Sequence, residues 1–188
     1  MVVDKLADVD ALLATRDSAI VKEWQLSDFA DLQPADIPHD EASVQKGMQA
    51  FMKAQCMQCH IVKGHGVKLG PELTKISDRF KGTKLLQQLL EPSAEINKDY
   101  RNFQFLLDSG KSVGGVVIAE DKLSYRVASN LLNPDATTNV VKSEIDEKIE
   151  SKISAMPVGL LNVLTREEIL CLLGYLEVGG YELPGHGK

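Results

Sequence analysis

The sequence predicts a mainly α-helical fold with an inserted small antiparallel β-meander and an N-terminal helical extension. Two segments, 43–55 and 166–178, repeat apolar residues at the three- and four-residue spacing of amphipathic helices. Between them, residues 102–128 contain three short runs of β-branched and aromatic residues separated by turn residues. We therefore expect an extension over 1–40 and one domain over 41–188, with the β insertion at about 101–142.

The first 40 residues are expected to form one or two helices that wrap the domain. Leu6, Val9, Leu12 and Leu13 have helical spacing, and the proline-containing stretch LQPADIPHD follows them. The segment begins MVVDKLADVD, with acids where a secretory signal has basic residues, and it lacks the continuous apolar run of such a signal. Either the chain stays in the cytosol or its signal has been removed.

The two amphipathic segments are expected to pack against each other. The last helix follows a capping box, Thr165-Arg166-Glu167-Glu168, and stops before Gly179-Gly180. Gly47 in the first helix and Gly174 in the last would permit a close backbone approach. Cys171 lies beside the apolar stripe of the last helix, which indicates a small buried apolar residue.

The inserted region reads as strands at about 102–108, 113–119 and 123–128. Turns are expected at Asp108-Ser109-Gly110 and at Glu120-Asp121, and Val140-Val141 is a candidate for a fourth strand. A sheet this small has only a modest core, so it should pack on the rest of the domain or on a neighbouring molecule.

The stretch AQCMQCHIVKGHG contains the strongest chemical signal, Cys56-x-x-Cys59-His60. A thioredoxin-like redox pair would follow a strand, but the preceding segment is helical. A zinc site would need more ligands, and the remaining histidines and Cys171 form no recognisable arrangement. Two small buried residues are a further alternative. Covalent attachment of one haem c, with two thioether bonds and the imidazole of His60 on the iron, fits the pattern best.

An electron-transfer haem with six ligands needs a second axial ligand, often a methionine thioether. Met156 precedes Pro157, which biases it towards an extended conformation on a stiff loop. The other methionines are the terminal one, two on a helix stripe and one between the cysteines. Met156 is therefore the best candidate, and a methionine that fills the core is the alternative.

These residues resemble a known family. Four stretches, KGMQAFMKAQCMQCH, KGHGVKLGPELTKISDRF, LLEPSAEINKDY and SAMPVGLLNVLTREEILCLLGYL, occur in an order and spacing similar to those of class I c-type cytochromes. The narrower resemblance is to the haem-binding domain of the Pirellula/Verrucomicrobium type, and it covers about residues 24–181. It implies the class I cytochrome c fold, thioether bonds at Cys56 and Cys59, axial ligation by His60 and Met156, and a proximal-side role for Pro71.

The charge pattern bears on partners. The chain has a formal net charge of −6, which does not favour nucleic acid, whereas residues 61–84 carry a net charge of +4. This basic segment is a candidate docking surface for an acidic redox partner, such as a dehydrogenase or another cytochrome, or it is simply a solvated loop. Three roles are open for the β insertion. It covers an otherwise exposed haem edge, it presents a surface for a partner or a second copy of the chain, or it is a plain structural elaboration.

Two function classes remain open. The favoured one is an electron carrier without enzymatic activity, either independent or as the electron-accepting module of a dehydrogenase system. The alternative is a haem enzyme or a gas or redox sensor in which Met156 is displaced, with His65 as the nearest candidate acid or base. No apolar stretch is long enough for a membrane span. Because haem c is attached outside the cytoplasmic membrane in bacteria, we expect a periplasmic protein whose signal has been removed.

Overall fold

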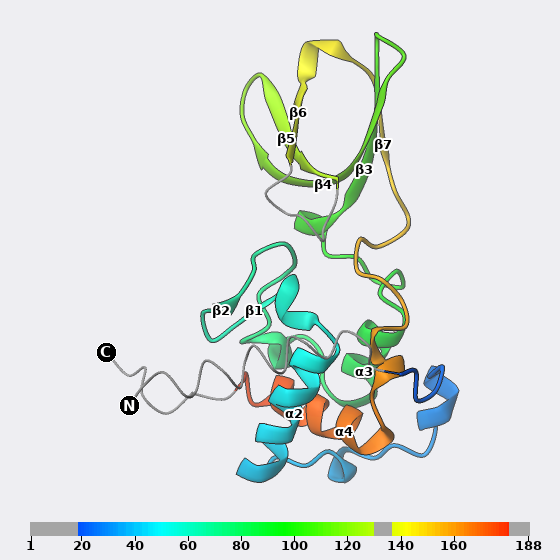
Figure 1. The fold of residues 1–188 in the computed structure, drawn as a ribbon, viewed down its shortest axis with the longest axis vertical. Helices are drawn as coiled ribbons and strands as arrows, with labels where there is room; N and C mark the ends of the chain where they lie inside the picture. Colours follow the sequence, from blue (N-terminus) through cyan, green and yellow to red (C-terminus); the bar gives the residue numbers. More distant parts are fainter. Residues whose placement is uncertain (1–18, 130–136, 181–188) are drawn as a thin grey trace.

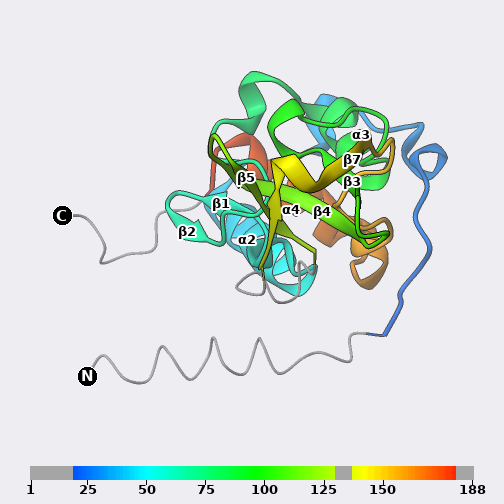
Figure 2. The same ribbon diagram turned by 90° about the horizontal axis from the view of Figure 1, so that it is seen from above.

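The computed structural model describes residues 19–129 and 137–180. Within them, three α-helices gather at one end of the molecule and a five-stranded sheet at the other (Figure 1). The helices are α2 (Glu41–Lys53), α3 (Gly82–Leu90) and α4 (Arg166–Glu177). Seen from above, the sheet lies over the helices (Figure 2). No helix in these two ranges is long and apolar enough to cross a membrane.

Helices α2 and α4 occupy the positions predicted from the two amphipathic segments, and they pack tightly against each other. Asp40 caps α2, because its side chain accepts a hydrogen bond from the Ser43 backbone N–H at 3.1 Å. At the crossing, a Cβ on Gly47 would overlap the carbonyl oxygen of Cys171 and lie 2.6 Å from Cβ of Tyr175. The glycine is therefore required by the close approach of the two helix backbones.

The predicted capping box at the start of α4 is confirmed. The Thr165 hydroxyl accepts from the Glu168 N–H at 3.2 Å, and the Glu168 carboxylate accepts from the Thr165 N–H at 2.7 Å. The same carboxylate accepts from Nζ of Lys53 at 2.8 Å, which ties the end of α2 to the start of α4. Cys171 is buried in α4, as the sequence indicated.

One apolar core fills the helical lobe. It is formed by buried side chains of the three helices and of the segments that connect them, including Phe29, Val44, Phe51, Leu86, Leu161, Leu164, Leu172 and Leu176. Loops with short 3-10 helices join these helices: η3 (Cys56–Gln58), η4 (Ile76–Asp78), η5 (Lys98–Tyr100) and η7 (Leu160–Val163). A two-stranded hairpin, β1 (Ile61–Val62) with β2 (His65–Gly66), projects from the first of these loops.

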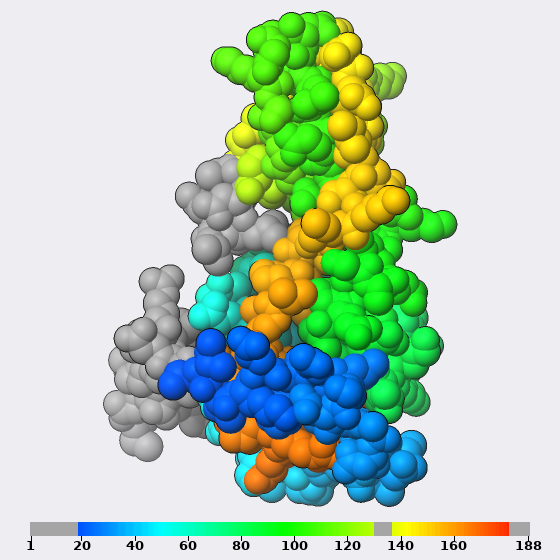
Figure 3. Space-filling model, turned by 90° about the vertical axis from the view of Figure 1, so that its right-hand side faces the viewer, coloured from blue at the N-terminus to red at the C-terminus, as the bar shows by residue number. Residues whose placement is uncertain are grey.

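The segment from residue 19 to residue 40 lies across the outer face of the helical lobe (Figure 3). It contains two 3-10 helices, η1 (Leu26–Phe29) and η2 (Pro34–Asp36), and no α-helix. Trp24 attaches it to the core by donating a hydrogen bond from Nε1 to the Leu164 carbonyl at 2.9 Å. The apolar repeat at residues 6–13, on which the expected helical extension mainly depended, lies outside the described residues.

The sheet has the strand order β6-β5-β4-β3-β7, and all its pairs are antiparallel. Its strands are β3 (Asn102–Leu107), β4 (Ser112–Glu120), β5 (Ser124–Ala128), β6 (Thr137–Val141) and β7 (Ile145–Glu150), and η6 (Lys142–Glu144) joins the last two. The three predicted strands and the candidate fourth strand are confirmed. The sequence reading missed β7, which pairs with β3 at the edge of the sheet.

The prediction of a mainly α fold is wrong. The sheet is a second lobe with its own buried cluster, Phe105, Val127 and Val140, and its strands contain about as many residues as the three α-helices. The reading failed at β7 because its sequence, IDEKIE, is dominated by charged residues. In the fold, Nζ of Lys148 lies 4.2 Å from the ring centroid of Phe103 and 4.3 Å from that of Tyr125. A lysine that packs on aromatic rings is not counted as apolar, so the hydrophobic pattern of the sequence does not indicate a strand here.

Candidate functional site

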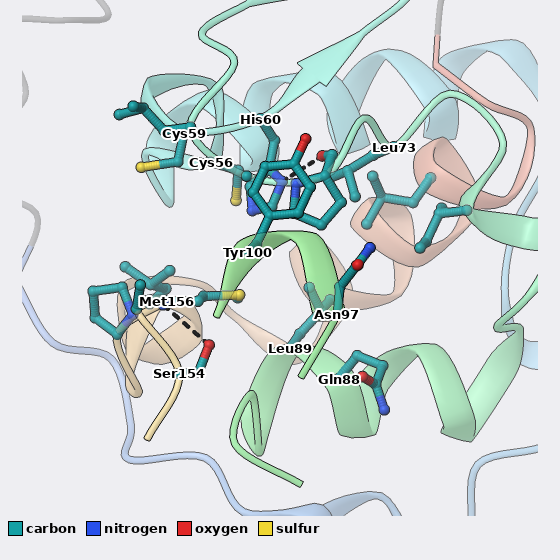
Figure 4. Close-up of a pocket in the computed structure, with 18 of the residues that line it drawn as sticks. Cys56, Cys59, His60, Leu73, Gln88, Leu89, Asn97, Tyr100, Ser154 and Met156 are labelled. Carbon is teal, nitrogen blue, oxygen red and sulfur yellow. Dashed lines mark hydrogen bonds between the residues drawn. The ribbon is translucent and has the colours of Figure 1, made fainter. Parts of the chain in front are cut away.

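A cavity of about 350 Å³ opens in the helical lobe. All five residues that the sequence reasoning selected line it: Cys56, Cys59, His60, Pro71 and Met156. Figure 4 labels the two cysteines, the histidine and the methionine. The first four come from the loops that follow α2, and Met156 comes from the segment between β7 and η7, about 100 residues later in the chain. The fold therefore brings together residues that the sequence separates widely.

The geometry of the Cys56–His60 segment follows from how α2 ends. Gln55, which follows the helix C-cap Ala54, adopts the left-handed conformation (φ 61°), and the chain continues into the 3-10 turn η3. Within this turn the N–H groups of Cys59 and His60 both donate to the Cys56 carbonyl, at 3.1 and 3.0 Å. This tight turn brings Cys56, Cys59 and His60 together, and all three line the cavity.

The His60 ring is held by a backbone carbonyl. Its Nδ1 lies 2.8 Å from the carbonyl oxygen of Pro71. Because a carbonyl oxygen only accepts, Nδ1 carries the proton and the lone pair is on Nε2. Burial lowers the pKa of His60, although the hydrogen bond to Pro71 acts in the opposite direction. The imidazole is therefore neutral, oriented and available to a metal through Nε2.

Gly70 leaves room for this ring. A Cβ at residue 70 would lie 2.6 Å from Cε1 and 2.9 Å from Nδ1 of His60, which is too close for carbon and nitrogen atoms that are not bonded. The N–H of Gly70 donates to the Cys59 carbonyl at 2.7 Å, so the loop is folded back on the cysteine segment. The Gly70-Pro71 pair thus packs against the ring and also supplies its acceptor.

The environment of both cysteines favours the protonated thiol over the reactive thiolate. Burial raises the pKa of Cys56 to about 12, and burial also raises that of Cys59. A dithiol redox pair needs the opposite, a thiol whose pKa is lowered by a helix N-terminus or a nearby positive charge. This environment does not support thiol–disulfide chemistry at the pair.

Met156 lies on the opposite wall of the cavity, with its thioether towards the interior (Figure 4). Its backbone N–H donates to the hydroxyl of Ser154 at 3.1 Å, and the Ser154 N–H donates to the hydroxyl of Ser93 at 3.0 Å. Pro157 follows directly and restricts the backbone of Met156. The loop is thus held by hydrogen bonds on one side of the methionine and by proline on the other.

Sequence reasoning missed several polar residues that line the cavity, among them Gln88 on α3, and Asn97 and Tyr100 at η5. Asn97 starts η5, because its side-chain oxygen accepts from the Asp99 N–H at 3.1 Å. Burial, together with nearby carboxylates, raises the pKa of Tyr100. The stretch LLEPSAEINKDY contributes to the family resemblance. Its asparagine, a residue common in turns, could have indicated the turn that brings Tyr100 to the cavity.

The chemistry of the cavity fits a haem group. Two thiols and the free Nε2 lie on one wall, a thioether lies on the other, and the remaining lining is mainly apolar: Phe51, Leu69, Leu73, Ile76, Phe80, Leu85, Leu89, Leu160 and Leu176. In residues 19–129 and 137–180, no three His, Cys, Asp or Glu side chains form a group suited to a metal ion bound by protein alone. Neither Cys171 nor His65 lines the cavity.

Comparison with known families supports the same chemistry. The family model Cytochrome c matches residues 44–105, a range that includes most of α2, the Cys56–His60 segment, α3 and the start of β3. The search of curated proteins found no match. The narrower resemblance to the Pirellula/Verrucomicrobium type stays a prediction.

Proposed function

We propose that this chain is a monohaem electron carrier, because the family model Cytochrome c matches residues 44–105 and because Cys56, Cys59, His60 and Met156 line one cavity. In this proposal Cys56 and Cys59 would hold the haem through thioether bonds, and His60 and Met156 would bind its iron. Haem c, when bound, supplies an iron that accepts and releases one electron. With His60 and Met156 both on the iron, no position would be left for a substrate, so the protein would work as a carrier and not as an enzyme.

One observation supports this proposal most strongly. Nε2 of His60 and the thioether of Met156 lie on opposite walls of the same cavity, and both thiols lie on the His60 side. The Pro71 carbonyl holds the His60 ring in place by a hydrogen bond, and Gly70 has no Cβ that would clash with it. Neither wall is explained by packing alone, since each presents metal-binding atoms into a cavity lined mainly by apolar side chains.

The chain itself orients the His60 imidazole and excludes water from the cavity. The Pro71 carbonyl orients the imidazole and increases its basicity as a ligand. Apolar residues around the cavity limit solvent access, which favours the less charged ferrous state and reduces the rearrangement that accompanies electron transfer.

The test is to mature the protein in a host that attaches haem c, and to measure its mass and visible spectrum. We expect the mass to rise by one haem per chain. The oxidised protein should show the weak red absorption band of a methionine–iron bond. Met156→Ala should abolish this band and lower the reduction potential. Met52→Ala, which removes a thioether from α2 outside the cavity lining, should change neither. Colourless protein of unaltered mass would refute the proposal.

The compartment and the partner belong to the same proposal. We place the protein in the periplasm, because haem c is attached outside the cytoplasmic membrane. Six basic side chains, Lys63, Lys68, Lys75, Arg79, Lys81 and Lys84, are exposed on the loops and helix around the cavity. They suit an acidic redox partner, a dehydrogenase or another cytochrome, and salt should slow the encounter.

Electron exchange with an acidic cytochrome measures this contribution. Lys68→Glu, next to the cavity-lining Leu69, should slow the exchange at low salt. Lys122→Glu, in the exposed β4–β5 turn of the sheet, is the matched control. Rates that are independent of ionic strength would contradict the docking surface.

A further inference from the structure

Two serines form a chain of hydrogen bonds that ends at Met156. The Ser93 hydroxyl accepts from the Ser154 N–H at 3.0 Å, and the Ser154 hydroxyl accepts from the Met156 N–H at 3.1 Å. We infer that Ser93 and Ser154 are positioning residues that hold Met156 in the place from which its thioether binds the iron. This inference rests on the proposed function, since it assumes that Met156 is the second axial ligand.

The segment before Met156 depends on hydrogen bonds because it has little packing. Residues 151–155 lead from the end of β7 to the cavity, and the side chain of Ile153 is 70% exposed. At its start, the Ser151 N–H donates to the Asn102 carbonyl at 2.8 Å, which continues the β3–β7 pairing. Between that attachment and the methionine, the Ser154 N–H ties the segment to another part of the chain by its hydrogen bond to Ser93.

Ser93 is exposed but belongs to a tight turn after α3. The Ala94 N–H donates to the Glu91 carbonyl at 2.9 Å, and Pro92 is buried. Leu89, at the end of α3, is also buried and lines the cavity. The serine hydroxyl therefore connects the methionine segment to a wall of the same cavity.

Consequently, the Ser93 and Ser154 bonds favour the conformation in which Met156 reaches into the cavity. Removing one bond should shift the equilibrium towards a displaced methionine, by roughly fivefold per bond. An added ligand that competes with methionine, such as imidazole, should then bind the oxidised protein about fivefold more tightly. The red absorption band should weaken in parallel.

The experiment measures imidazole affinity of the oxidised holoprotein in Ser93→Ala and Ser154→Ala, each alone and combined with Met156→Ala. Ser112→Ala is the matched control, because its hydroxyl accepts from Nε2 of Gln104 at 2.7 Å on the sheet, away from the cavity. Thermal unfolding of each variant reports whether the fold is retained.

A positioning role predicts a specific pattern. Each serine substitution should tighten imidazole binding when Met156 is present and should have no effect in the Met156→Ala background. If the substitutions tighten binding equally in both backgrounds, they loosen the cavity in general, and the inference is overturned. Unchanged affinity together with a normal red band also overturns it and leaves the proposed function intact. A missing red band in the unaltered protein overturns both.

Discussion

The crossing of α2 and α4 allows a quantitative prediction at Gly47. In Gly47→Ala, the new Cβ would overlap the Cys171 carbonyl oxygen and lie 2.6 Å from Cβ of Tyr175. Carbon atoms in contact are normally about 3.5–4.0 Å apart, so the two helices would have to separate by about 1 Å. Two of the crowded atoms belong to the Cys171 backbone, and no side-chain rotation can relieve the clash.

The magnitude follows from two opposing effects. Alanine is a better helix former than glycine by about 1 kcal/mol. Overpacking of a close interface costs about 1–3 kcal/mol, and a clash with backbone atoms lies at the upper end of this range. We expect Gly47→Ala to reduce the free energy of unfolding by about 2 kcal/mol, which corresponds to a Tm lower by roughly 4–8 °C for a chain of this size.

Thermal and denaturant unfolding of the holoprotein, followed by far-UV circular dichroism, measure the effect. Gln49 is exposed on the same helix, so Gln49→Gly compared with Gln49→Ala gives the helix-propensity difference without the clash. Alanine should be the more stable residue at position 49 and the less stable one at position 47. If it stabilises both positions equally, the backbones do not approach as closely as we infer.

Two further predictions concern the cavity and the helix junction. Gly70→Ala places a Cβ 2.6 Å from Cε1 of His60, and should lengthen the ring's hydrogen bond; an unshifted Nδ1–H proton resonance would contradict this. In Glu168, burial acts to raise the carboxyl pKa, but hydrogen bonds, first that from Lys53, outweigh it and hold the pKa below its usual value. Stabilisation by this carboxylate is therefore present above its unfolded pKa and lost as the pH falls through its lowered folded pKa. Glu168→Gln should cost about 1 kcal/mol at neutral pH and nothing in acid, whereas the exposed Glu167→Gln should have little effect at either pH.

Much of the candidate site could be predicted because its signals are local. Cys56, Cys59 and His60 lie within five consecutive residues, so they come together without any long-range contact. Met156 could be selected because a proline follows it and because the other methionines had simpler explanations. That these residues are the ligands of a haem remains a prediction, which the measurements on Met156→Ala address.

Residues that act through partners distant in the chain could not be found in this way. Ser93 and Ser154 are ordinary serines in the sequence, and their role arises only when the end of α3 meets the segment after β7. Tyr100 likewise reaches the cavity only because η5 turns the chain towards it. Hydroxyl groups have no periodic signature, so their partners decide what they do.

The amino-acid sequence by itself determined the helices at the two ends of the domain, the cap of α4, four strands and the Cys56–His60 turn, because each depends on interactions between near neighbours in the chain. Only the tertiary structure decided that the sheet is a second lobe with a core of its own, that the charged strand β7 belongs to it, and that Met156 faces His60 across one cavity. These features depend on contacts between residues that are far apart in the chain, and such contacts are set by the packing of the whole molecule.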